Sequence, residues 1–181
     1  DLIIGNKEEN YKGGIERLKE KYPVWMSDIV TLQDALSMIV SIGKLTDRQN
    51  GAQQINTAIL QAFDRVEKYS NQSVLYLLWR KPWMAAGSGT FIHTLLTTIG
   101  LKNAANEIPR YPQLTSDQIR KLKPDYIFLS SEPYPFREKH IEELRSLSPA
   151  SRIILVDGEM FSWYGSRLMK APEYFNRLPL E

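Results

Sequence analysis

Three short segments of the chain are unusually rich in aromatic side chains. They are Trp79-Arg-Lys-Pro-Trp-Met84, Glu132-Pro-Tyr-Pro-Phe136 and Glu159-Met-Phe-Ser-Trp-Tyr164. Three of the four tryptophans lie in two of these segments, although tryptophan is normally buried and loops are normally polar. Aromatic faces suit a wide, partly apolar ligand, and the alternative is that the rings pack beneath the loops. The predicted ligand-binding side chains are Trp79, Arg80, Trp83, Tyr134, Phe161, Trp163 and Tyr164.

Arg80 and Lys81 lie beside the tryptophans of the first segment. The planar guanidinium of Arg80 is suited to contact a carboxylate or an amide of a ligand, and it can also stack on an aromatic ring. The alternative is that both cations form a solvated surface pair, and for Lys81 this is the better interpretation. Arg80 is therefore the polar candidate in the predicted site.

Residues that would support catalysis or metal binding are scarce. The chain has no cysteine and two histidines, His93 and His140, and neither histidine has a second ligand at a metal-binding spacing. The segment Gly87-Ser-Gly-Thr90 lacks the lysine and the third glycine of phosphate-binding motifs, so we interpret it as a helix cap. No side chain stands in a known catalytic motif. We therefore expect no metal site, no resident cofactor and no enzymatic activity.

Composition narrows the class of protein further. The chain has 181 residues, 43% of them hydrophobic, which is enough to build a globular core. Its 23 Lys and Arg residues against 21 Asp and Glu residues give a net charge of +2, with no run of like charges, so nucleic acid is not expected as a partner. No stretch approaches the roughly 18 apolar residues of a transmembrane helix, so the chain is not expected to span a membrane.

Strand and helix patterns alternate in the second half of the chain. Strands are predicted at residues 74–78, 126–129 and 153–156, and helices at 88–100, 136–147 and 166–175, with a short helix opened by Thr115. This alternation predicts a parallel sheet covered by helices. The three aromatic segments follow the three strands, and ligands of such sheets bind outside the carboxyl ends of the strands.

The first half of the chain has a different pattern. Strands at 2–4 and 24–26 flank a predicted helix, and a further helix begins at Thr31 with Asp34 as its capping partner. Apolar residues at alternating steps of four and three from 50 to 69 predict one helix of roughly 30 Å. We therefore divide the chain into residues 1–48, a linking helix at 49–70, and residues 71–181. Because a strand begins at once, we expect further elements upstream.

Several segments resemble the class III substrate-binding proteins of ABC importers, in particular the receptors for cobalamin and iron complexes. They are Asp1-Leu-Ile-Ile4, Asn6-Lys-Glu-Glu-Asn10, Leu77-Leu-Trp-Arg-Lys-Pro-Trp-Met84, Tyr111-Pro-Gln-Leu-Thr-Ser-Asp117, Ser131-Glu-Pro-Tyr-Pro-Phe136 and Phe161-Ser-Trp-Tyr-Gly-Ser-Arg167. The resemblance covers nearly the whole chain. It implies an α/β fold of two Rossmann-like lobes joined by a long backbone helix, with the ligand between the lobes and with the amino-terminal lobe incomplete.

The resemblance also implies a function. A protein of this family is periplasmic or extracellular, and it can be anchored to a lipid. It delivers its ligand to an ABC permease, and the implied ligand is a corrinoid such as vitamin B12, an iron chelate or haem. Asp117 matches an acidic position that docks on the permease, and its alternative role is to stabilise the first turn of a helix capped by Thr115. Two other classes stay open: a transferase-like α/β enzyme holding a nucleotide or sugar with the same aromatic loops, and an interaction module with an aromatic surface.

Overall fold

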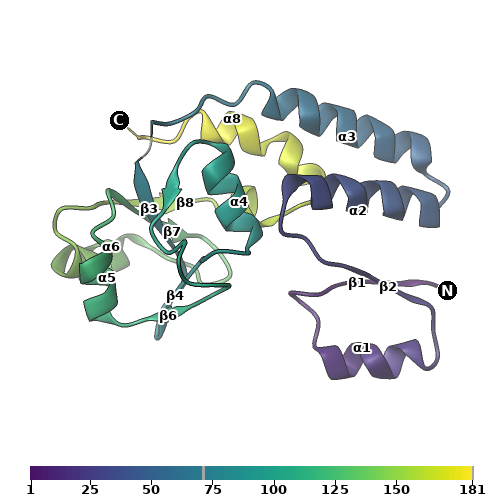
Figure 1. Cartoon of the computed structure of the whole chain (residues 1–181), viewed down its shortest axis with the longest axis horizontal. Coiled ribbons are helices and arrows are strands. Elements are labelled where there is room, and N and C mark those ends of the chain that lie inside the picture. The colour runs from purple at the N-terminus through teal and green to yellow at the C-terminus, as the bar shows by residue number, and fades with distance from the viewer. Residues whose placement is uncertain (71, 181) are drawn as a thin grey trace.

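The chain begins with a small β-α-β unit. The computed structural model describes residues 1–70 and 72–180, and its first elements are β1 (Ile3–Asn6), α1 (Lys12–Lys19) and β2 (Val24–Ser27). β1 and β2 are parallel, with Ile3 opposite Val24 and Asn6 opposite Ser27. The unit lies to one side of the rest of the molecule, as Figure 1 shows. The predicted β-α-β arrangement is therefore confirmed.

Two antiparallel helices follow, α2 (Leu32–Leu45) and α3 (Gln49–Phe63). The predicted cap of α2 is present, because the Thr31 side chain accepts a hydrogen bond from the Asp34 backbone N–H and Asp34 accepts one from the Thr31 N–H. The two helices approach closely where Gly43 faces Ala52, since a Cβ on Gly43 would lie 2.5 Å from the Ala52 Cβ. The pair forms a helical hairpin that packs against the helices covering one face of the large sheet.

The single long helix predicted from 50 to 69 is wrong in its length. α3 ends at Phe63, although Val66 and Tyr69 continue its apolar spacing and pack against the same core. Tertiary hydrogen bonds replace helical ones beyond that point: the Glu67 N–H donates to Asn176 Oδ1 at 2.9 Å, and the Tyr69 N–H donates to the Ile99 carbonyl at 2.9 Å. Contacts with segments far away in the sequence therefore end the helix.

The second half of the chain forms a larger sheet. Its elements are β3 (Ser73–Trp79), β4 (Trp83–Ala85), α4 (Phe91–Thr98), β5 (Lys102–Asn103), β6 (Gln113–Leu114), α5 (Ser116–Leu122), β7 (Tyr126–Ser130), α6 (Glu138–Leu147), β8 (Arg152–Val156), α7 (Glu159–Ser162), the 3₁₀ turn η1 (Ser166–Met169) and α8 (Ala171–Phe175). The strand order is β6-β4-β3-β7-β8, and β5 also pairs with β3. β3, β7 and β8 are parallel, as predicted, whereas β4 and β6 are antiparallel additions.

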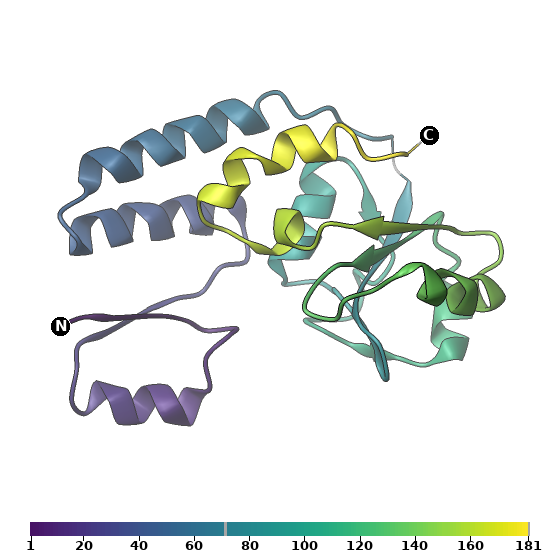
Figure 2. The same cartoon turned by 180° about the vertical axis from the view of Figure 1, so that it is seen from behind.

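Side chains of the central strands alternate between two cores. Val74 and Tyr76 of β3 face α4, the helical hairpin, α7 and α8, whereas Leu75 and Leu77 face α5 and α6. Figure 2 shows α8 beside α3 on the first of these faces. Because both faces are covered, the central strands are almost wholly buried, as in other parallel sheets. The carboxyl ends of these strands are therefore held at fixed positions.

Some predicted helix ends differ from the structure. α4 begins at Phe91 rather than at Ser88, because Thr90 is its N-cap and Gly89 has a left-handed φ of 69°. The last predicted helix, 166–175, is divided into η1 and α8. Pro172 lies at the start of α8 and has no N–H to continue the preceding turn.

Candidate functional site

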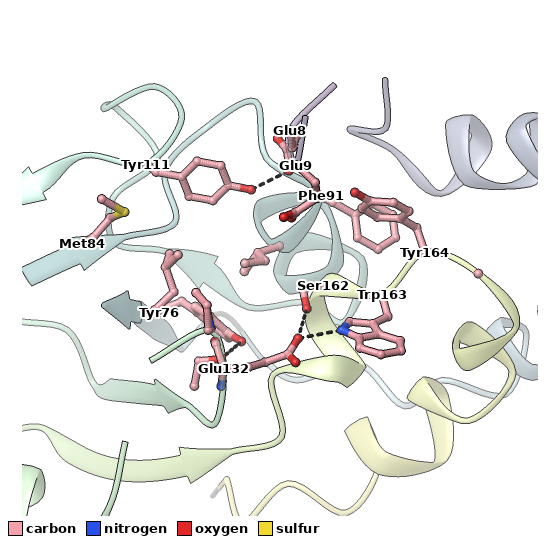
Figure 3. Close-up of a pocket in the computed structure, with 15 residues that line it drawn as sticks. Glu8, Glu9, Tyr76, Met84, Phe91, Tyr111, Glu132, Ser162, Trp163 and Tyr164 are labelled. Carbon is pink, nitrogen blue, oxygen red and sulfur yellow. Dashed lines mark hydrogen bonds between the residues drawn. The ribbon is translucent and has the colours of Figure 1, made fainter. Parts of the chain in front are cut away.

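A cavity of about 640 Å³ opens at the carboxyl ends of β3 and β7, where the small unit meets the large sheet. Figure 3 shows side chains from both parts of the molecule around it. Its lining residues are Glu8, Glu9, Tyr76, Leu78, Met84, Phe91, Ile92, Tyr111, Ser130, Glu132, Pro133, Ser162, Trp163, Tyr164 and Gly165. Its size and mostly apolar lining are typical of a small-molecule site, and its place in the sheet is the one predicted.

The floor of the cavity is a buried hydrogen-bonded pair. The Tyr76 hydroxyl donates to Ser130 Oγ at 3.0 Å, and both side chains are almost wholly buried. The Ser130 hydroxyl in turn donates to the Glu132 carbonyl. Burial raises the pKa of Tyr76, so this phenol stays neutral. The floor is therefore rigid and uncharged.

Glu132 holds a tryptophan at one side of the cavity. Its Oε1 accepts a hydrogen bond from the Ser162 hydroxyl at 2.8 Å and another from the indole Nε1 of Trp163 at 2.7 Å. The guanidinium of Arg167 lies 5.5 Å from the centre of the Trp163 ring. Trp163 is nevertheless 49% exposed. One carboxylate thus fixes the orientation of an accessible aromatic ring, because hydrogen bonds to ionised acceptors are strong.

The opposite side is built by the loop after β1. The Asn6 side chain accepts hydrogen bonds from the backbone N–H groups of Glu8 at 2.8 Å and Glu9 at 3.2 Å, which folds the loop over the end of the strand. Glu8 then reaches the large sheet: it pairs with Arg110, and its Oε2 accepts a hydrogen bond from the Tyr111 hydroxyl at 2.9 Å. This contact joins the two parts of the molecule.

Two further tyrosines of the cavity are influenced by these carboxylates. The pKa of Tyr111 is raised, first by burial and then by the charge of Glu8. Burial, followed by the charges of Glu8 and Glu9, raises the pKa of Tyr164 to about 12. Both phenols are therefore neutral at physiological pH, and the proton of Tyr111 is donated to Glu8.

The structure brings only some of the predicted ligand-binding residues to the cavity. Trp163 and Tyr164 line it. Trp79 and Tyr134 lie outside it, with their ring centres 5.7 Å apart in an edge-to-face contact. Arg80 also lies outside and pairs with Glu143 at 2.7 Å. The prediction that three loops converge on one site is thus only partly matched by the geometry.

Two predicted residues belong to the core, which corrects their assignment. Phe161 is wholly buried between Tyr76 and Phe175. Trp83 is 8% exposed and stacks on Phe136 in the core beneath α5 and α6. Trp83 is buried because the segment predicted as a loop turns back at once into β4 and pairs with β3. For these two side chains, packing beneath the loops was the correct interpretation.

Several cavity residues were not among the predicted ones. Glu8 and Glu9 lie directly after a predicted strand, which was the available signal, and Glu132 lies within an aromatic segment. Tyr76 could not be predicted as a cavity residue, because it lies within a predicted strand whose other residues are also apolar or aromatic. Tyr111 reaches the cavity from the loop between β5 and β6, which follows none of the three predicted parallel strands. Its position depends on the tertiary fold alone.

The two histidines and Thr90 make their contacts outside the cavity. Neither histidine lines it: His93 Nδ1 is 3.2 Å from the Asn103 amide nitrogen, and His140 Nδ1 accepts the Arg137 N–H at 2.9 Å. Thr90 caps α4 as predicted, with its hydroxyl oxygen 3.1 Å from the His93 backbone nitrogen. Within residues 1–70 and 72–180, no three histidine or acidic side chains are grouped so that they could hold a metal ion.

Comparison with known proteins identifies the family. Residues 1–150 match the family model described as periplasmic binding protein. The chain belongs to the periplasmic binding protein family. A comparison with curated protein sequences gave no match.

Solved periplasmic binding proteins share the fold. The heme-binding protein BhuT, solved with two hemes, is 20% identical with a TM-score of 0.81, over 98% of this chain and 74% of its own. The vitamin B12 binding protein BtuF of Vibrio cholerae is 16% identical, with a TM-score of 0.71, over 97% of this chain and 72% of its own. A protein of an Fe3+-hydroxamate transport system from Saccharomonospora viridis is 19% identical, with a TM-score of 0.72, over 97% of this chain and 67% of its own.

These similarities confirm the predicted α/β fold and the predicted family. The family is one of substrate-binding proteins, and the solved structures that resemble this chain include proteins of transport systems. No helix in the described part of this periplasmic binding protein is both long enough and apolar enough to cross a bilayer.

Proposed function

We propose that this chain is an extracytoplasmic receptor that binds a metal chelate and delivers it to an ABC permease. The ligand class comprises corrinoids, haem and iron chelates. The observation that carries the proposal is the cavity of about 640 Å³, which is lined mainly by apolar and aromatic side chains of the large sheet and its loops and is closed on one side by Glu8 and Glu9 of the small unit. Solved structures with the same fold are named for heme binding, for vitamin B12 binding and for an Fe3+-hydroxamate transport system.

The arrangement of the cavity suits a receptor. Its two sides belong to different parts of the chain, and they are joined by the contact of Glu8 with Arg110 and Tyr111. A ligand between them would touch both, so that binding would stabilise one relative placement of the two parts. A permease can recognise such a loaded state. The exposed Asp117 on α5 stays our proposed docking residue.

The transferase-like alternative has less support. It would hold a nucleotide or sugar with the same aromatic loops, but Trp79, Arg80 and Tyr134 of those loops lie outside the cavity, and the Arg80 guanidinium is paired with Glu143. The Ser162 hydroxyl donates to Glu132, but no histidine joins the pair. We therefore treat the cavity as a binding site without a reaction.

Ligand titration tests the proposal. Haem, cobalamin, cobinamide and ferric hydroxamates would each be added to the purified chain, with tryptophan fluorescence, visible absorbance and thermal unfolding as readouts. We expect at least one ligand to quench fluorescence at micromolar concentration and to raise the melting temperature, because Trp163 lines the cavity and ligands stabilise the state that binds them. If no member of the panel changes any readout, the proposed function is wrong.

A further inference from the structure

We infer that the cavity selects metal chelates by charge, taking those with a positive charge and rejecting anionic ones. This inference rests on the proposed function and narrows its ligand class. It depends on the charged groups that line the cavity and on how each is compensated by its neighbours.

The charged side chains of the cavity are all acidic. Glu8, Glu9 and Glu132 line it, and none of its described lining residues is a lysine or an arginine. Carboxylates carry a negative charge at neutral pH. The rest of the lining supplies aromatic and aliphatic side chains with a few hydroxyl groups, so only the carboxylates discriminate by charge.

Three cations that adjoin residues of the cavity are already paired. Arg110 pairs with Glu8, and Arg167, which lies over Trp163, pairs with Glu159. Lys7 of the β1 loop pairs with Asp28. None of the ion pairs within residues 1–70 and 72–180 includes Glu9 or Glu132. The carboxylates of Glu9 and Glu132 therefore have no ion-pair partner in the described part of the chain.

Other dipoles do not reverse this sign. The amino-terminal end of α4 meets the cavity at Phe91 and Ile92, and a helix end carries roughly half a positive charge. Two full negative charges outweigh it. The effect on Tyr164 agrees, because the charges of Glu8 and Glu9 contribute to its raised pKa after burial.

The carboxylates also have room for a donor from the ligand. Both hydrogen bonds to Glu132 are received by Oε1. Among the described residues, no hydrogen bond is made to Oε2 of Glu132 or to the carboxylate of Glu9. An ammonium or guanidinium group on a chelate would supply such donors. Haem propionates or a catecholate complex would instead add like charges to the same cavity.

A matched series of ligands tests the inference. The ferric complex of desferrioxamine B carries a pendant ammonium group and one positive charge. Its N-acetyl derivative is neutral, and its N-succinyl derivative carries one negative charge, while the iron centre is unchanged. We expect affinity to fall in that order by about fivefold per step, the effect of a unit charge at roughly 8 Å in a partly solvated site. The differences should shrink as salt is added.

Variants then assign the selectivity to the two carboxylates. Glu9→Gln and Glu132→Gln should each reduce the preference for the cationic member by about fivefold, and the double variant should abolish it. Glu142→Gln is the matched control, because Glu142 lies on α6 outside the cavity and pairs with Arg145. Thermal unfolding of each variant verifies that it is folded.

The outcomes separate this inference from the proposed function. Equal or tighter binding of the anionic member would overturn the charge selection and leave the receptor function standing. Binding of haem with no binding of the cationic chelate would do the same. If nothing in either panel binds, the proposed function itself is wrong.

Discussion

At the residue scale, aromatic side chains that are neighbours in the sequence have different roles. Phe161 is wholly buried, whereas Trp163, two positions later, is 49% exposed and lines the cavity. The reason is geometric, because positions two apart on a helical turn point to nearly opposite sides. α7 ends at Ser162, so Phe161 points into the core and Trp163 points out over Glu132. Composition alone does not separate these roles.

Trp163→Ala should weaken ligand binding by at least about 1 kcal/mol and leave the free energy of unfolding almost unchanged. The ring is half exposed, so its loss removes contacts to the ligand and little core packing. Titration and urea unfolding of the same variant measure both effects. Unchanged affinity with a large loss of stability would show that the ring is structural.

Trp83→Ala should behave in the opposite way. Trp83 is 8% exposed and stacks on Phe136, so its truncation leaves a cavity in the core and should reduce the free energy of unfolding by about 3 kcal/mol. Where the variant is still folded, ligand affinity should be retained. If the variant instead lost ligand affinity while its free energy of unfolding was unchanged, Trp83 would be a ligand-binding residue after all.

At the element scale, local signals fix where helices begin but not always where they end. The Thr31 capping box starts α2 and the Thr115 capping box starts α5, both as the sequence predicted. The end of α3 at Phe63 was not predicted, because hydrogen bonds of Glu67 and Tyr69 to distant segments decide it. Helix starts are thus encoded within a few residues, and this helix end is encoded in the tertiary contacts.

The cap of α2 should make stability depend on pH. Hydrogen bonds from the Thr31 side chain and backbone hold the pKa of Asp34 below its ordinary value of 3.8. A lowered pKa means that the contribution to stability is present above pH 3.8 and is lost as pH falls through the native pKa. Asp34→Ala should therefore cost about 1 kcal/mol at pH 7 and less at pH 3.

Urea unfolding of wild type and variant at both pH values measures this difference. Gln33→Ala, at the neighbouring and exposed position of α2, is the control, because it removes no titrating group. A cost of Asp34→Ala that does not change with pH would show that its charge is not involved in the cap.

At the scale of the whole molecule, the site depends on how the small unit docks on the large sheet. Glu8 provides the joint: its side chain is 12% exposed, it pairs with Arg110, and it accepts a hydrogen bond from Tyr111. Removing one partner of a shielded ion pair leaves the other charge uncompensated. The orientation of the first unit, and with it one side of the cavity, therefore depends on this contact.

Arg110→Ala should loosen the first unit selectively. We expect faster amide hydrogen exchange in β1, α1 and β2 and unchanged protection in β3 and β7, which are buried within the large sheet. Ligand affinity should fall as well. Lys102→Ala, an exposed change in β5 away from this contact, is the control. Uniformly unchanged exchange would show that the Glu8 contact does not hold the unit.

Asp117→Arg tests the contact with the permease. The Asp117 side chain is 81% exposed and pairs with Arg120, so charge reversal should abolish binding to the reconstituted permease while ligand affinity is unchanged. Loss of the helix-dipole interaction should cost no more than about 1 kcal/mol of stability. Glu138→Arg, in the first turn of α6, is the matched control for that effect. If both variants affect only stability, Asp117 is a helix-start residue and nothing more.

The sequence by itself determined the parallel strands, most of the helices and the order in which they follow one another. The strand patterns, the capping boxes at Thr31 and Thr115, and the place of the site at the carboxyl ends of the strands could all be predicted, because each depends on neighbours within a few residues or on a general rule for parallel sheets. The expected family followed from the same segments. These features need no knowledge of long-range contacts.

Only the tertiary structure decided which side chains form the cavity. Glu8 and Glu132 come from opposite parts of the chain, and Tyr111 comes from a loop that follows none of the three predicted parallel strands. Trp83 and Trp163 have the same chemistry, but one is packed in the core because its segment turns back into β4 and the other remains at the surface. Burial depends on what the rest of the chain places opposite a residue, and that information is not local.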